Sequence, residues 1–151
     1  MKPQQSDAIP VISTKTRTTL KSLMQDIGNL PLDIEKDVEE GAVTQVGPMI
    51  FVYRGADGNP DTVFELEIAQ PVESTQTYKG KFDASSLEPI TYIERRFTGS
   101  FVDIGSKGYE PLINDILKAG HAMAGQCREV YTHWVNPESD ENITELQIAI
   151  A

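Results

Sequence analysis

Cysteine, basic residues and long apolar runs are scarce in this sequence. A single cysteine, Cys127, excludes an internal disulfide, and we expect a cytoplasmic protein. Lysine and arginine number 13 against 23 acidic residues, a formal net charge of −10, and the basic clusters that direct nucleic-acid binding needs are missing. No run approaches the roughly 20 apolar residues of a membrane-spanning helix, and no signal-peptide pattern opens the chain. The acidic balance favours cationic or neutral ligands, although it could equally serve only solubility.

Patterns for metal binding and for common catalytic sites are also absent from the sequence. His121, Cys127 and His133 lack the spacing of a zinc site, so we expect no metal and no cofactor. No glycine-rich phosphate loop and no Ser-His-Asp spacing is present. These absences leave small-molecule binding by aromatic and acidic side chains as the chemistry to look for.

The sequence does contain a β-hairpin pattern over its last 24 residues, 128–151. Residues that favour strands are dense in the first arm, turn residues follow, and the second arm alternates between apolar and polar side chains. Glu129, Tyr131 and His133 share one face of the first arm. In the second arm the large aliphatic residues are predicted to face the core, which leaves Glu145 on the opposite face. Pairing the arms could therefore place Tyr131 beside Glu145.

A similar hairpin pattern over residues 50–72 indicates an internal duplication. Tyr53 precedes Tyr131 by 78 positions, and Glu65 precedes Glu145 by 80 positions. One pair of prolines and one pair of glycines are each 79 positions apart. A period of this length in two copies is not that of a solenoid. The sequence therefore predicts two similar halves.

We expect these halves to form one domain, residues 1–151. The pseudo-repeats run over about 8–72 and 87–151, and a polar link joins them over about 73–86. Each repeat has the order strand, helix, strand, strand, and the clearest helix begins near Tyr109, where apolar residues recur with helical spacing. The predicted fold is α+β, an antiparallel sheet with helices on one face and a ligand groove on the other.

Four stretches of the second half carry a resemblance to a known family. They are Gly99-Ser100-Phe101, the helix from Tyr109, Arg128-Glu129-Val130-Tyr131 and Thr144-Glu145-Leu146-Gln147-Ile148. They resemble the gyrase-inhibitor-like small-molecule-binding domains, also met as effector-binding domains of some AraC- and MerR-type regulators. The resemblance covers residues 8–151 and implies two strand-helix-strand-strand units. It also implies a multidrug-type groove that takes lipophilic, often cationic, molecules between aromatic walls and a buried glutamate.

The same resemblance assigns candidate ligand contacts. Glu145 would be the buried glutamate, with Tyr131 and Phe101 as aromatic wall, although Phe101 stands where the family usually has a tyrosine. Apart from the resemblance, the residue patterns add Trp134, Tyr53, Phe51, Glu65 and His133 as candidate contacts. No DNA-binding segment precedes residue 8, which implies a free-standing binder.

The leading hypothesis is a protein that senses or sequesters a lipophilic, cationic small molecule. A hydrolase of strained or electrophilic molecules is the alternative, with Glu145 holding water and Tyr131 or a protonated Glu65 supplying a proton. A further hypothesis is an inhibitory partner of a topoisomerase. A haem binder, with His133 as axial ligand, is the last, since some haem-binding proteins have a distantly similar fold.

Overall fold

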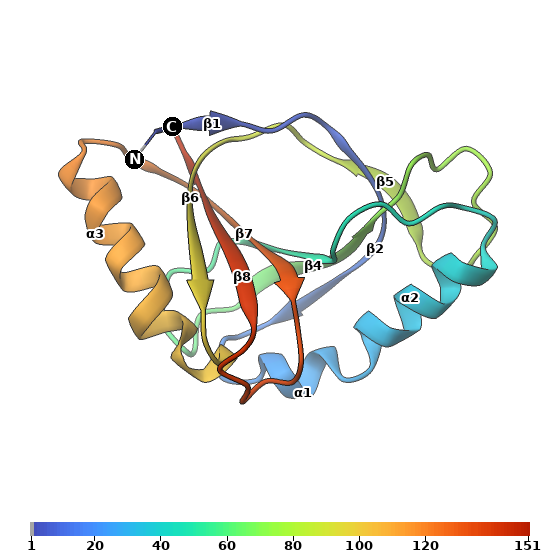
Figure 1. Cartoon of the computed structure of the whole chain (residues 1–151), viewed down its shortest axis with the longest axis horizontal. Helices are drawn as coiled ribbons and strands as arrows, with labels where there is room; N and C mark the ends of the chain where they lie inside the picture. The colour runs from blue at the N-terminus through green and yellow to red at the C-terminus, as the bar shows by residue number, and fades with distance from the viewer. Residues whose placement is uncertain (1) are drawn as a thin grey trace.

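An eight-stranded antiparallel sheet forms the frame of the molecule, with the strand order β1-β6-β8-β7-β3-β4-β2-β5 (Figure 1). The computed structural model describes residues 2–151. The strands are β1 Gln4–Gln5, β2 Ile9–Thr18, β3 Ile50–Arg54, β4 Phe64–Pro71, β5 Asp83–Leu87, β6 Thr91–Thr98, β7 Met123–His133 and β8 Ile143–Ile150. The predicted α+β class is confirmed.

The helices lie between the first and second long strands of each half. They are α1 Leu23–Ile27, α2 Leu30–Glu40, the 3₁₀ turn η1 Phe101–Asp103, the π-helix η2 Ile104–Tyr109 and α3 Glu110–Lys118. A proline in the first turn of both α2 and α3 suits a helix start, because the missing N–H has no intrahelical partner there. Among residues 2–151, no helix is long and apolar enough to cross a membrane.

Both halves show the order strand, helix, strand, strand: β2, α1 and α2, β3, β4 in one, and β6, α3, β7, β8 in the other. The innermost strands β3 and β7 pair with each other at the centre of the sheet. The polar link contributes β5, which pairs with β2. That the two halves arose by an internal duplication stays a prediction.

A short link forces the sheet to curl. Residues 88–90 join β5 to β6, which lie six strand positions apart in the sheet. A flat sheet would separate these strands by about 29 Å, whereas four residue steps span about 14 Å. The sheet therefore curves until its ends approach, and the link closes the ring at the top of Figure 1.

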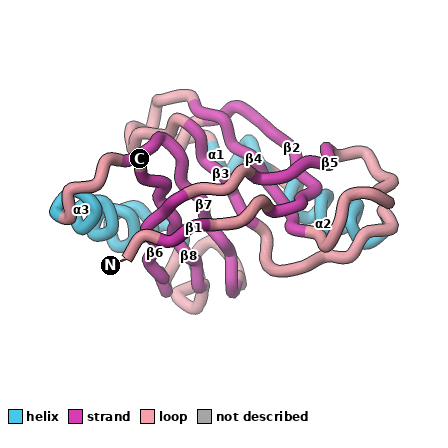
Figure 2. Tube along the Cα trace, turned by 90° about the horizontal axis from the view of Figure 1, so that it is seen from above, coloured by secondary structure: helices cyan, strands magenta, loops and turns pink. Residues whose placement is uncertain are grey.

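The two faces of the curled sheet consequently differ. The inner face holds a small apolar cluster that includes Val11, Val52 and Leu87. The outer face carries the helices, with α2 against β2 and β4 and α3 against β6. Figures 1 and 2 show α2 and α3 at opposite ends of the molecule. The central strands β3 and β7 are thus left between the helices.

Candidate functional site

A cavity of about 740 Å³ opens on the helix-bearing face, over the central strands. Its walls come from β3, β7 and β8 on one side and from the start of α1, η2 and α3 on the other. The apolar, aromatic and sulfur-containing lining side chains are Leu20, Leu23, Tyr53, Phe101, Ile104, Tyr109, Ile113, Met123, Cys127 and Ile148. This volume and lining are those of small-molecule sites.

The cavity is not where the sequence placed the groove. We expected it on the face opposite the helices, but that face is the inside of the curl and is filled by its own apolar cluster and by the fully buried side chain of Arg128. The opening arises instead because each helical segment packs on its own half of the sheet. The middle of the outer face is left uncovered.

The electrostatic character of the cavity is negative. Three carboxylates line it, those of Asp57, Glu110 and Glu129, and among the described lining residues there is no lysine, arginine or histidine. Asp57 is exposed at the rim, where its oxygens already accept hydrogen bonds from the Asn59 amide and the Thr62 hydroxyl. Glu129, in contrast, lies on β7 with only 2% of its surface exposed. It is therefore the buried charge of this site.

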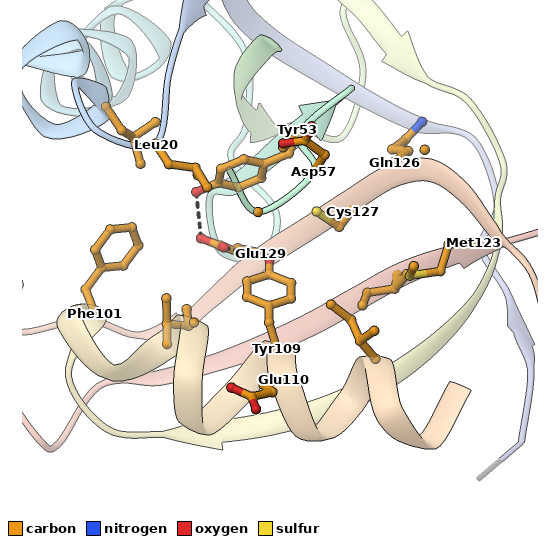
Figure 3. Close-up of a pocket in the computed structure, with 18 of the residues that line it drawn as sticks. Leu20, Tyr53, Asp57, Phe101, Tyr109, Glu110, Met123, Gln126, Cys127 and Glu129 are labelled. Carbon is orange, nitrogen blue, oxygen red and sulfur yellow. Dashed lines mark hydrogen bonds between the residues drawn. The ribbon is translucent and has the colours of Figure 1, made fainter. Parts of the chain in front are cut away.

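Glu129 is held by three tyrosine hydroxyls, and Figure 3 shows two of these tyrosines, Tyr53 and Tyr109, beside it. Tyr53 donates to Oε1 at 2.9 Å, Tyr131 donates to the same oxygen at 2.5 Å, and Tyr109 donates to Oε2 at 2.6 Å. Within the described part of the chain, no basic side chain forms an ion pair with Glu129. Burial raises the pKa of Glu129, and the three hydrogen bonds oppose that rise.

Burial and the Glu129 charge act together on the neighbouring acids. They raise the pKa of Tyr53, Tyr109 and Tyr131, so these hydroxyls remain protonated donors. Burial, and then the Glu129 charge, raise the pKa of Cys127 to about 12. The thiol therefore stays protonated near neutral pH and is a poor nucleophile.

The local chain path explains how Tyr109 reaches Glu129. Tyr109 ends the π-helix η2, a wide turn of a kind that is frequent at functional sites. Gly108 lets this turn press on β8, because a Cβ there would lie 2.8 Å from Cδ1 of Leu146. The close approach brings the start of α3 near the sheet, and Figure 3 shows the Tyr109 ring pointing into the cavity.

The structure gathers the predicted aromatic residues around this cavity. Tyr53 and Phe101 line it, and Tyr131 donates to Glu129. Phe51 packs edge-on against Tyr131 at 4.8 Å between ring centroids, and Trp134 lies 5.9 Å from Phe101 and 5.4 Å from Tyr131. Phe51, Tyr131, Trp134 and Phe101 thus form a continuous row of ring contacts beside the cavity, and Tyr53 lines the cavity apart from that row.

The predicted charged residues lie elsewhere. Glu145 points to the opposite face and pairs with Arg96 at 2.7 Å. The β7–β8 register explains this: Tyr131 lies opposite Thr144 and Glu145 opposite Val130, so Tyr131 and Glu145 project from opposite faces. Glu65 pairs with Arg54 at 3.4 Å on that same opposite face. His133, the last residue of β7, is exposed and does not line the cavity.

Sequence reasoning passed over Glu129. Its signal was present, because Glu129 shares a strand face with Tyr131 two positions on, and the stretch Arg128-Glu129-Val130-Tyr131 carried the family resemblance. The buried glutamate was instead assigned to Glu145, in the second arm of the hairpin. Tyr109 was read only as part of an amphipathic helix.

No family model and no curated protein matches the sequence. Solved structures match its fold. The C-terminal domain of EcmrR has a TM-score of 0.78 at 15% identity, over 99% of this chain and 96% of that one. SAV2435 bound to tetraphenylphosphonium has a TM-score of 0.69 at 13% identity, over 99% and 93%.

EcmrR in a DNA complex has a TM-score of 0.76 at 16% identity, over 99% of this chain. This chain spans only 56% of that one. Identities this low show a shared fold and nothing further. The comparisons therefore agree with the architecture and leave function to the site itself.

Proposed function

We propose that this protein binds lipophilic cationic small molecules in the cavity, with Glu129 as the charged contact. One observation carries the proposal: a buried carboxylate faces an apolar and aromatic cavity and has hydroxyl donors but, among residues 2–151, no positive partner. A buried charge without a counter-charge is costly. A ligand cation supplies the missing charge, and the apolar lining receives the lipophilic body.

The cavity walls suit the same class of ligand. Aromatic faces attract cations, most strongly when water is excluded, and the rings of Tyr53, Phe101 and Tyr109 line the cavity. The tetraphenylphosphonium bound by SAV2435 has this chemistry, a delocalised charge inside an apolar shell. On the resemblance to gyrase-inhibitor-like domains, we assign the role of the buried glutamate to Glu129 in place of Glu145.

We infer that binding serves to sense or sequester the ligand, as in the effector-binding domains that the chain resembles, and that the protein acts in the cytoplasm. The half-buried, unpaired Cys127 supports a reducing compartment. The hydrolase hypothesis loses its groups at the cavity, since Glu145 and Glu65 pair with arginines on the other face, away from Tyr131. The haem hypothesis loses its ligand, because His133 lies outside the cavity.

Titration with tetraphenylphosphonium, followed by Trp134 fluorescence, tests the proposal. Trp134 contacts Phe101 on the cavity wall, so occupancy should change its emission. Glu129→Gln should weaken binding by about tenfold or more, because a desolvated charge interaction contributes roughly 1.5–3 kcal/mol. Tetraphenylborate, with the same shape and the opposite charge, should bind far more weakly.

Glu145→Gln is the matched control, since it removes an acidic group from the opposite face. The Glu145→Gln variant should bind tetraphenylphosphonium as tightly as the wild type does. Loss of binding in Glu145→Gln with full binding in Glu129→Gln would refute the assignment and restore the site predicted from the sequence. Equal affinity for the phosphonium and the borate would refute the role of charge altogether.

A further inference from the structure

We propose that the three tyrosines around Glu129 make the site selective among cations. They favour cations that carry no N–H donor, such as quaternary ammonium and phosphonium ions, over primary ammonium ions of the same shape. This inference rests on the proposed function and adds a rule for the head group.

The argument starts from the number of acceptor positions on Glu129. A carboxylate offers roughly four lone-pair sites. Tyr53 and Tyr131 occupy two on Oε1, and Tyr109 occupies one on Oε2. About one site, on Oε2, is left for a ligand.

A primary ammonium brings three N–H donors into the cavity. One of them can reach the free site on Oε2, and the other two need acceptors elsewhere or must displace a tyrosine. The other acidic side chains offer little, because Asp57 is already bonded at the rim and Glu110 lies beyond Tyr109, away from Glu129 (Figure 3). Gln126 is bonded to Glu88 and Arg128. Donors left unpaired in a desolvated site reduce affinity.

A quaternary ammonium or phosphonium has no N–H donors and therefore needs no acceptors in the cavity. Its charge needs only proximity to the carboxylate, and its methyl or phenyl groups can pack on the tyrosine rings. The hydrogen bonds of the tyrosines to Glu129 then stay intact while the cation binds. The same three hydroxyls that stabilise the carboxylate thus leave too few acceptor positions for the three N–H donors of a primary ammonium.

Tyr109 is the residue on which this selectivity can be tested. Tyr53 and Tyr131 share Oε1, whereas Tyr109 is the single tyrosine that donates to Oε2. Tyr109→Phe removes that hydroxyl, keeps the ring and leaves Oε2 open. A primary ammonium should gain from the freed oxygen, and a quaternary ion should not.

The experiment compares two fluorescent probes with the same aromatic body, 1-pyrenylmethyl-trimethylammonium and 1-pyrenylmethylammonium, titrated at pH 7.5. The wild type should prefer the trimethyl probe, and Tyr109→Phe should reduce that preference by about tenfold or more, the size expected for one recovered charged hydrogen bond. Changes that affect both probes alike, including a changed pKa of Glu129, cancel in the ratio. Tyr92→Phe, whose hydroxyl bonds Gln4 far from the cavity, should leave the ratio unchanged.

Each outcome separates the two claims. If the wild type binds both probes equally, or Tyr109→Phe keeps the wild-type ratio, the selectivity is refuted and the cation site stands. If the wild type binds neither probe nor tetraphenylphosphonium, the proposed function itself fails. Should Tyr109→Phe not fold, Tyr131→Phe opens a site on Oε1 and must shift the ratio in the same direction.

Discussion

Two glutamates of the sheet, Glu67 and Glu129, are equally buried, each with 2% of its surface exposed, but they have different kinds of partner. On the inner face, Glu67 binds the Arg54 guanidinium at 2.8 Å and accepts from the Ser13 hydroxyl at 2.7 Å. On the helix face, Glu129 accepts hydrogen bonds from three tyrosines and has no positive partner in the described part of the chain. One carboxylate is neutralised within the fold, and the other is left for a ligand.

The difference separates a structural charge from a functional one. An internal ion pair of good geometry keeps the desolvation cost of its members low as long as both are present. Tyrosine hydroxyls lower that cost without cancelling the charge, so the site keeps its attraction for a cation. Burial alone would not have distinguished these residues; the partners do.

The largest expected effect is on stability, when Glu67 loses its internal partner Arg54. Arg54→Met leaves Glu67 buried with only Ser13 as a partner, and we expect the free energy of unfolding to fall by about 3 kcal/mol. Urea denaturation at pH 7 measures it. Arg96→Met is the matched control, because Arg96 is 64% exposed where it pairs with Glu145, and the loss there should stay below about 1 kcal/mol.

A double variant sharpens this result. Arg54→Met combined with Glu67→Gln removes both charges and should recover part of the lost stability. Additive losses in the double variant would mean that the pair is not coupled. Tetraphenylphosphonium affinity should stay unchanged in all of these variants, because the changes lie on the inner face.

A smaller effect is expected at Cys127, which senses the Glu129 charge from within the cavity. Alkylation by iodoacetamide at pH 8 should be much slower than for a free thiol, because burial and Glu129 raise the pKa of Cys127 to about 12. Glu129→Gln should speed the reaction several-fold by removing the neighbouring negative charge. Glu145→Gln should not change it, and a rate as slow in Glu129→Gln as in the wild type would contradict the coupling.

The sequence predicted the architecture well for a definite reason. Periods of two and 3.6 residues record which side chains are buried, and they identified α3, the β7–β8 hairpin and the α+β class. They do not record which face of a sheet lies inside a curl. The groove was therefore placed on the wrong side, since the closure by residues 88–90 is a long-range property of the chain.

The prediction of residues near the cavity has a related explanation. Tyr53 and Tyr131 were chosen because they occupy matching places in the two hairpin patterns, and Trp134 was chosen because an indole ring attracts cations. Glu145 was preferred to Glu129 because of the family resemblance and the repeat with Glu65, but the observed register places Glu145 opposite Val130, on the other face from Tyr131. Tyr109 comes from another element altogether, and only the packing of η2 on β8 brings its hydroxyl to Glu129.

The raised pKa of Glu129 links its charge to pH in a fixed direction. In the ligand-free protein the protonated form is favoured by folding, so its contribution to stability is complete at a pH below the usual carboxyl pKa and is lost as the pH rises through the raised value. A bound cation favours the ionised form instead. Binding should therefore release a proton wherever Glu129 is still protonated.

The affinity for tetraphenylphosphonium as a function of pH, measured in the wild type and in Glu129→Gln, tests this account most directly. The ligand itself does not titrate, so the change must come from the protein. The wild-type affinity should rise by up to about tenfold per pH unit from pH 4.5 upward and level off above the raised pKa, and the profile of Glu129→Gln should be much flatter. Parallel profiles in the two proteins would show that Glu129 is not the group that receives the cation.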